Sequence, residues 1–263
     1  MDLGIKNKVL IITGGSKGIG EGITRLAADE GAIPVIVGRN KETGESLLTE
    51  LKSQGKEVYF IEVELGTKES CKRVIDETLQ KYGRIDALIN NAGANDSVGL
   101  ESGSPDKFLQ SLTNNLYHYY YLAHYSLGAL KKSKGSIVNI SSKTAVTGQG
   151  NTSGYAAAKG AQLALTREWA VELLQYGIRV NAVIPAEVMT PLYKKWISTF
   201  PNPDKKLEEI TKNIPFGNRM TTKEEIASMV IYLVSGQASH ITGQHLYVDG
   251  GYVHLDRSLA SKK

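Results

Sequence analysis

Tyr155 and Lys159 are four residues apart in a segment, residues 153–161, whose composition favours a helix. That spacing places a phenol and an ammonium on one helical face, one turn apart. A positive charge close to a phenol stabilises the phenolate and lowers the pKa of the phenol, so such a tyrosine can act as a general acid or base. The pair is therefore a candidate for proton transfer, although the same spacing also occurs by chance on solvated helices.

A hydroxyl group is expected near this pair. Residues 137–142, Ile-Val-Asn-Ile-Ser-Ser, form an apolar run of the strand type that ends in two serines, and Ser142 precedes Tyr155 by thirteen residues. In open α/β sheets, ligands bind outside the carboxyl ends of the strands. We therefore expect Ser142 and Tyr155 to reach the same crevice.

A glycine-rich turn lies near the N-terminus. Residues 13–20, Thr-Gly-Gly-Ser-Lys-Gly-Ile-Gly, follow the first predicted strand and open the first predicted helix. Glycine permits the tight turn, lets the backbone approach a pyrophosphate and leaves the helix N-terminus facing the anion. A dinucleotide beside a proton-transferring tyrosine indicates hydride transfer, whose chemistry belongs to the cofactor. The cofactor contacts predicted in this turn are Gly14, Ser16, Lys17, Gly18, Ile19 and Gly20.

Short apolar runs alternate with longer segments of helical period along most of the chain. The predicted strands are residues 9–13, 33–37, 58–63, 85–89, 136–140, 178–183 and 245–248. The predicted helices are residues 21–30, 42–54, 68–82, 106–131, 153–176 and 223–234. Apolar strands separated by helices are typical of a parallel sheet covered on both faces. We predict an α/β fold: one doubly wound (Rossmann) domain over residues 1–263, with a parallel sheet of about seven strands.

Two stretches depart from this regular pattern. Pro34 falls inside a predicted strand, where proline removes a ladder hydrogen bond. Residues 191–215 form a long insertion with a weak period and prolines at 191, 201, 203 and 215. Long insertions in compact domains usually serve function. We predict that residues 191–215 cover the substrate.

Composition argues against several classes of function. The net charge of +4 is dispersed, which argues against a nucleic-acid partner. Cys71 is the single cysteine, so no intrachain disulfide can form and no metal site is predicted. The chain shows no leader peptide and no apolar run near the ~18 residues of a membrane span. We expect a cytoplasmic protein with no membrane partner.

The end of the second predicted strand bears on the choice between NAD and NADP. In folds of this type, an acidic residue there hydrogen-bonds the ribose of NAD. Here the strand ends at Gly38 and Arg39, and Arg39 could fork onto a 2′-phosphate with Lys17 as a second cation. Both cations could instead be ordinary surface charges. We predict NADP, with NAD possible.

Seven motifs occur in a recognisable order. They are Thr13-Gly-x-x-x-Gly-Ile-Gly20, Asn90-Asn-Ala-Gly93, Asn115, Ser142, Tyr155-x-x-x-Lys159, residues 185–191 and Asp249-Gly-Gly251. With them the chain resembles the short-chain dehydrogenase/reductase family over nearly its whole length. The chain departs from the family at Ala186, where glycine usually follows the proline. The resemblance implies an NAD(P)-dependent dehydrogenase.

The resemblance also implies roles for individual residues. Asn115, Ser142, Tyr155 and Lys159 would form a catalytic tetrad. Ser142 would hydrogen-bond the reacting oxygen and Tyr155 would exchange its proton. Lys159 would hold the ribose and lower the pKa of Tyr155, while Asn115 would support a water that links Lys159 to solvent. The other cofactor contacts implied, beside Tyr155 and Lys159, are Glu64, Asn90, Ala92, Gly93, Pro185, Val188 and Thr190.

Within the family, residues 141–155 and 181–193 look like those of bacterial L-fucose dehydrogenases, which oxidise the anomeric carbon of the sugar to a lactone. A sugar site needs side chains that pair with hydroxyls, since a buried unpaired polar group costs ~1–3 kcal/mol. Trp196 could offer an apolar face to the sugar ring. Polar residues between a strand and a helix can also simply make turns. The predicted substrate contacts are Asn95, Asp96, Ser142, Lys143, Gln149, Tyr155, Glu187 and Trp196.

We therefore expect an oxidoreductase that transfers a hydride from the anomeric carbon of an aldose, L-fucose or a similar sugar, to NADP. One alternative is an NADPH-dependent carbonyl reductase of a 3-oxoacyl thioester or a ketone, which would need an apolar or phosphopantetheine-binding surface. A cofactor-binding sensor or scaffold without chemistry is a second alternative. The complete tetrad argues against it.

A dense aromatic block follows Asn115. Aromatic side chains dominate buried contact surfaces, so a packing or subunit-interface face is favoured over a cofactor site. The family resemblance implies a homotetramer built on such helices. The block comprises Tyr117, His118, Tyr119, Tyr120, Tyr121, His124 and Tyr125.

The prediction for Arg39 can be tested by reversing its charge. In Arg39→Asp, we expect kcat/KM with NADP to fall and kcat/KM with NAD to rise, because a carboxylate repels the 2′-phosphate and can bind the ribose hydroxyl. Steady-state kinetics with both cofactors measure the ratio. An unmodified protein that clearly favours NAD would contradict the prediction.

Overall fold

The computed structural model describes residues 2–256, so both ends of the predicted domain 1–263 lie outside the described residues. Within them, seven strands form one parallel sheet in the order β3-β2-β1-β4-β5-β6-β7. This order confirms the predicted doubly wound α/β domain. The strands are β1 (Val9–Thr13), β2 (Ile33–Gly38), β3 (Tyr59–Glu62), β4 (Ala87–Asn90), β5 (Ser136–Ile140), β6 (Arg179–Pro185) and β7 (His245–Val248).

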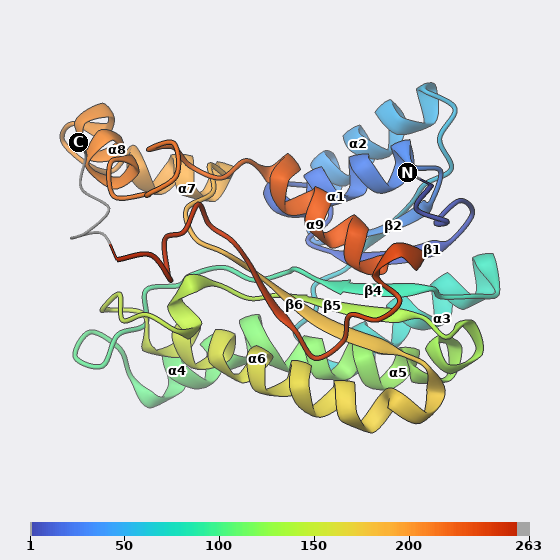
Figure 1. The fold of residues 1–263 in the computed structure, drawn as a ribbon. Coiled ribbons are helices and arrows are strands. Elements are labelled where there is room, and N and C mark those ends of the chain that lie inside the picture. The colour runs from blue at the N-terminus through green and yellow to red at the C-terminus, as the bar shows by residue number, and fades with distance from the viewer. Residues whose placement is uncertain (1, 257–263) are drawn as a thin grey trace.

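Helices cover both faces of the sheet (Figure 1). One face carries α1 (Gly18–Asp29), α2 (Lys41–Ser53) and α9 (Lys223–Val234). The other carries α3 (Lys68–Tyr82), α4 (Pro105–Leu112), α5 (His118–Ser133) and α6 (Ser153–Leu173).

Side chains of each strand alternate between the two faces. In β1, Val9 and Ile11 belong to the core on the face of α3, α5 and α6, while Leu10 and Ile12 belong to the core on the face of α1 and α9. All four side chains are buried, and burying each stabilises the fold by about 1.5–3 kcal/mol. This two-sided burial holds the carboxyl ends of the strands in a fixed frame.

Pro34 is tolerated in β2 although that strand is internal. Ile33 donates its N–H to the carbonyl of Lys8, on the β1 side, so the nitrogen of the next residue faces β3. Pairing with β3 begins only at Val35. The missing N–H of Pro34 therefore removes no hydrogen bond from the sheet.

The predicted bounds of two helices are confirmed, and their ends explain why. A capping box formed by Thr67 and Ser70 begins α3, which ends at Gly83 in the left-handed region (φ 69°). A second capping box, of Thr222 and Glu225, begins α9. These local stop and start signals are readable from the sequence.

The single helix predicted over residues 106–131 is wrong. A π-helical turn, η1 (Thr113–Tyr117), separates α4 from α5. Such a turn fits one extra residue into the helical ladder and is stabilised by bonds from outside the helix. Here the fully buried Asn115 accepts a hydrogen bond at its main-chain carbonyl from Gln162 and one at its side chain from the N–H of Ala94.

The insertion over residues 191–215 folds as two short helices, α7 (Pro191–Ile197) and α8 (Pro203–Thr211). Each has proline in its first turn and a capping side chain before it, from Thr190 and Asn202. Both lie beyond the carboxyl end of β6, near the last described residues (Figure 1). This placement is compatible with the predicted substrate cover, whose role stays a prediction.

Candidate active site

The predicted site residues gather where the strand order reverses. The chain runs outward from β1 to β3 on one side and from β4 to β7 on the other, which opens a crevice at the carboxyl ends of β1 and β4. Gly14 follows β1, Asn91 follows β4, Ser142 lies just beyond β5 and Glu187 just beyond β6. The sheet therefore brings four separate segments to one edge.

The glycine-rich turn has the shape of an anion cradle. Gly14 and Gly18 have φ values of 63° and 55°, which favour glycine. A Cβ at Gly20 would lie 2.1 Å from the carbonyl oxygen of Gly14. Lys17, the N-cap residue of α1, makes no side-chain capping bond, so the first N–H groups of the helix remain available to an anion. The turn fits a pyrophosphate.

Asn91, which the sequence reasoning missed, ties this turn to β4. Its Nδ2 donates to the main-chain carbonyl of Thr13 at 2.8 Å, and its main-chain N–H donates to Thr13 Oγ1 at 2.8 Å. Thr13 is fully buried. The sequence did hold a signal for this role of Asn91. Consecutive side chains of a strand point to opposite faces, so Asn90 and Asn91 cannot both face the crevice.

Two predicted cofactor residues turn their side chains away from the crevice. Asn90 is fully buried and donates from Nδ2 to Asn139 Oδ1 at 3.0 Å, between β4 and β5. Val188 packs into the core formed with α1 and α9. Any contact that either makes with a cofactor must come from its main chain.

Other predicted cofactor residues do meet at the crevice. A Cβ at Gly18 would lie 3.1 Å from Thr190 Cγ2, so the loop after β6 touches the glycine-rich turn. Gly93, with φ 154°, lies so close to Asn115 that a Cβ there would be 2.8 Å from Asn115 Oδ1. Pro185 ends β6 behind this loop, and Ile19 stands in the first turn of α1. The main-chain N–H of Ala92 donates to Thr13 Oγ1, and the carbonyl oxygen of Ala92 hydrogen-bonds His118 Nε2.

At the far end of the cradle, Arg39 and Glu64 form an ion pair with 3.1 Å between Nη1 and Oε1. Their side chains are 76% and 70% exposed, and such a surface pair contributes at most about 1 kcal/mol. Ser16 lies near this end, with its Oγ 3.3 Å from Thr43 Oγ1. Arg39 can therefore turn to a phosphate at little cost.

Ser142 and Tyr155, two of the predicted catalytic residues, meet at one end of the crevice. The side chain of Ser142 hydrogen-bonds Tyr155, which lies in the first turn of α6. Burial raises the pKa of Tyr155 to about 12, the hydrogen bond with Ser142 opposes that rise, and the negative charge of Asp96 adds to it.

Lys159 is nearly fully buried, one helical turn further along α6. Its Nζ lies 5.5 Å from the centre of the Tyr155 ring and donates to the carbonyl of Ile140 at 2.7 Å. Burial lowers the pKa of Lys159 to about 7. The predicted lowering of the Tyr155 pKa by Lys159 is therefore wrong for the protein alone, because burial disfavours the charged form of both groups.

Two predicted substrate residues, Lys143 and Glu187, form an ion pair beside this centre. Each side chain is only 11% exposed. Lys143 Nζ also lies 4.2 Å from the centre of the Tyr252 ring. Tyr193 hydrogen-bonds Glu187, and burial together with this carboxylate raises the pKa of Tyr193. The structure thus brings the pair together from the segments that follow β5 and β6.

Of the remaining predicted substrate residues, Asp96 lies close enough to Tyr155 for its charge to act on that tyrosine, and the others are more peripheral. Asp96 accepts from Ser111 Oγ at 3.0 Å, and Asn95 accepts from the N–H of Ser97 at 3.0 Å. Gln149 is exposed. Trp196 is 44% exposed in α7, beyond the carboxyl end of β6.

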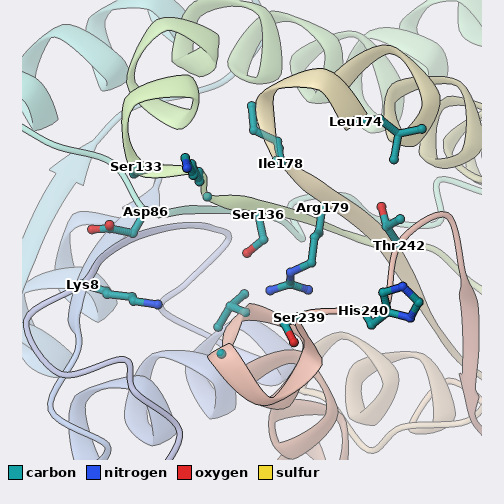
Figure 2. Close-up of a pocket in the computed structure, with 15 residues that line it drawn as sticks. Lys8, Asp86, Ser133, Ser136, Leu174, Ile178, Arg179, Ser239, His240 and Thr242 are labelled. Atoms are coloured by element: carbon teal, nitrogen blue, oxygen red, sulfur yellow. The ribbon is translucent and has the colours of Figure 1, made fainter.

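A pocket of about 530 Å³ opens at the opposite edge of the sheet, away from this chemistry (Figure 2). It is lined by Ser136 and Arg179, the first residues of β5 and β6. Arg179 already donates to the carbonyls of Ser235 and Ile241. We assign this pocket no part in catalysis, since the predicted catalytic residues lie at the carboxyl ends of the strands.

Among residues 2–256, no group of His, Cys, Asp or Glu side chains is placed to hold a metal ion. No helix there is long and apolar enough to cross a membrane.

Comparison with known proteins identifies the family. A family model described as Enoyl-(Acyl carrier protein) reductase matches residues 14–253. L-fucose dehydrogenase of Bos taurus is 36% identical over 245 residues, which cover 93% of this chain and 88% of that protein. The chain belongs to the short-chain dehydrogenase/reductase family. Within the family, 3-oxoacyl-[acyl-carrier-protein] reductase FabG of Thermotoga maritima is 34% identical over 95% of this chain and 99% of its own.

Solved structures of dehydrogenases agree with this assignment. The Cj0485 dehydrogenase is 52% identical, with a TM-score of 0.94 over 100% of both chains. The aldohexose dehydrogenase of Thermoplasma acidophilum, in ligand-free form, is 33% identical, with a TM-score of 0.87 over 96% of both chains. The protein is thus a dehydrogenase or reductase of the short-chain family that uses a nicotinamide cofactor.

Gly20 offers a test of the cradle. In Gly20→Ala the new methyl would collide with the carbonyl of Gly14, so the turn must open. We expect the Kd for NADP or NAD, measured by fluorescence titration, to rise at least about tenfold, the equivalent of one good hydrogen bond. Gly148→Ala is the matched control, because no atom beyond its chain neighbours lies within 4 Å of its new Cβ. An unchanged Kd in Gly20→Ala would contradict the assignment of the turn.

Proposed function

We propose that this protein oxidises an aldose, L-fucose or a similar sugar, at the anomeric carbon, with hydride transfer to NADP and formation of the lactone. The observation that carries the proposal is the buried ion pair of Lys143 and Glu187 beside Ser142 and Tyr155. The similarity to an L-fucose dehydrogenase and an aldohexose dehydrogenase supports it.

The ion pair suits a sugar because a hydroxyl group both donates and accepts hydrogen bonds. The carboxylate of Glu187 only accepts and the ammonium of Lys143 only donates, so together they can pair both functions of one hydroxyl or of two neighbouring ones. Burying two charges costs desolvation energy that their attraction often fails to repay. A pair kept in the substrate half of the crevice is therefore better explained by recognition than by stability.

The chain's own residues divide the remaining work. Ser142 orients the hydroxyl of the anomeric carbon toward Tyr155, which takes its proton. The pKa of Tyr155, about 12 in the protein alone, must fall for this step at neutral pH. When bound, the oxidised nicotinamide would supply the hydride acceptor and a positive charge in the crevice. When protonated, Lys159 holds a second positive charge on the same side.

The preference for NADP rests on the two cations near the ribose end of the cradle. Arg39 is exposed directly after β2, and Lys17 is exposed in the glycine-rich turn. Glu64 already pairs with Arg39, and such a pair opens readily. A 2′-phosphate, which carries more charge than a carboxylate, would compete well for Arg39.

A carbonyl reductase is the second candidate. The observation that favours it is a group of exposed apolar side chains at the mouth of the crevice: Met189 is 40% exposed and Leu192 53%. These could contact an acyl chain, and the similarity to FabG points the same way. In the deeper charged pair, Lys143 could donate to a carbonyl oxygen of such a substrate, but Glu187 would find no donor in the 3-oxoacyl group or the ketone.

We also propose assembly into a homotetramer through α5. The aromatic block on this helix does not form one face: Tyr119 and His118 are buried, whereas Tyr120 is 51% exposed and stacks on His124. Exposed stacked aromatic rings are typical of protein interfaces. The exposed members of the block form the proposed contact.

A panel of aldoses tests the proposed function. With NADP, we expect L-fucose, L-galactose and D-arabinose, which share a ring configuration, to yield NADPH together, followed by absorbance. Tyr155→Phe should lower kcat at least about a hundredfold, as expected for loss of a general base. NADPH oxidation with a 3-oxoacyl thioester, and no turnover of any aldose, would favour the reductase instead.

Glu187→Gln tests the recognition of the sugar. We expect KM for the aldose to rise about tenfold or more, because a hydrogen bond to a charged group is lost, while the Kd for the cofactor stays the same. The melting temperature should also fall, since Lys143 loses its buried partner. The matched control is Glu172→Gln, which removes an exposed carboxylate from α6. Unchanged sugar kinetics would remove Glu187 from the site.

A further inference from the structure

The ammonium of Lys159 has all three of its N–H donors engaged by protein groups. An ammonium has three donors and no acceptor. Nζ lies 2.7 Å from the carbonyl oxygen of Ile140, 3.3 Å from Gln162 Oε1 and 3.4 Å from the hydroxyl of Tyr119. Gln162 and Tyr119 are both fully buried. A buried polar cage therefore surrounds the charge.

Gln162 connects this cage to the π-helical turn. While its Oε1 accepts from Lys159, its Nε2 donates to the main-chain carbonyl of Asn115 at 2.7 Å. One carboxamide thus links Lys159 to Asn115, where the family resemblance implied a water that joins Lys159 to solvent. Unlike a water, the carboxamide has a fixed position, and it cannot relay a proton because its oxygen only accepts and its nitrogen only donates.

We propose that Gln162 is a positioning residue of the catalytic centre, which fixes the ammonium of Lys159 against the end of β5 and stabilises its charged form, with Tyr119 assisting. Gln162 acts through Lys159 and reaches neither substrate nor cofactor in this arrangement. Its part in turnover rests on the proposed function, whereas its effect on Lys159 does not.

The neutral acceptors around Lys159 have a large influence on whether its amine is charged, because no negative charge in the described part of the chain pairs with it. Within the described residues, no carboxylate forms an ion pair with Lys159. The other titratable groups that face it are Tyr155 on its own helix and, from α5, His118, whose pKa burial lowers to about 4 so that it is neutral at pH 7. Asp96 faces Tyr155 from the loop after β4. Removing an acceptor must therefore favour neutral Lys159, and adding a negative charge must favour the ammonium.

Two substitutions of Gln162 should shift the titration midpoint of Lys159 in opposite directions. In Gln162→Leu the acceptor is lost, so the titration midpoint of Lys159 should fall by roughly one pH unit; in the nearly isosteric Gln162→Glu it should rise by at least roughly one. Tyr119→Phe should lower it by a smaller amount. The midpoint is read from ¹³Cε-labelled lysine by NMR, with the Lys159 resonance identified by its absence in Lys159→Met.

Thr166→Val is the matched control for packing. Thr166 is fully buried one turn further along α6 and donates to the carbonyl of Gln162, but it does not contact Lys159. We expect the melting temperature of this variant to fall while the titration midpoint of Lys159 stays unchanged. A shift in Thr166→Val as large as in Gln162→Leu would overturn the proposal, as would midpoints unchanged in Gln162→Leu and Gln162→Glu.

Kinetics and cofactor binding then separate this inference from the proposed function. In Gln162→Leu, kcat should fall about tenfold above the new Lys159 midpoint, and the limb of the pH profile should move with it; the Kd for the cofactor should rise over the same pH range. In Gln162→Glu, kcat should not show this fall over the same pH range, because Lys159 stays charged. If the NMR midpoints shift as expected but no aldose is oxidised, the proposed function fails and the role of Gln162 stands.

Discussion

A positive charge held out of water is the constraint on which the rest of the site depends. Lys159 is 3% exposed, and taking an ammonium out of water costs several kcal/mol unless hydrogen bonds replace the lost hydration. The hydrogen-bond acceptors that replace this hydration come from three elements. They are the last carbonyl of β5, a tyrosine of α5 and a glutamine of α6. The π-helical turn before α5 anchors the glutamine. The site can therefore exist only where these elements cross.

The two halves of the crevice are lined by different kinds of group, main chain in one and side chains in the other. The cofactor half is made largely of main chain: glycines that permit close approach, the N–H groups at the start of α1, and Asn91, which fixes the turn to β4. The half where we propose that the substrate binds is made of charged and aromatic side chains, among them Lys143 and Glu187. Main-chain recognition serves any dinucleotide, whereas side chains determine the substrate. Relatives at about 35% identity therefore share the family but act on sugars and on acyl thioesters alike.

The fold was predictable because its determinants are local or periodic. Short apolar runs marked the strands, and a helical period marked the segments between them. The interruption of the predicted helix at Asn115 was not predictable, since the hydrogen bonds that stabilise the π-helical turn come from Ala94 and Gln162. Pro34 also needed the sheet, because its cost depends on which neighbour its nitrogen faces.

The sequence by itself determined the family, the doubly wound fold, the glycine-rich turn and the spacing that puts Tyr155 and Lys159 on one helix, because these follow from residue type and near-neighbour spacing. Only the tertiary structure decided the directions of the two pKa shifts, which burial sets. It also decided the pairing of Lys143 with Glu187, 44 residues apart, and the place of Gln162 beneath Lys159. Desolvation and long-range contact depend on which elements pack together, and no spacing along the chain records that.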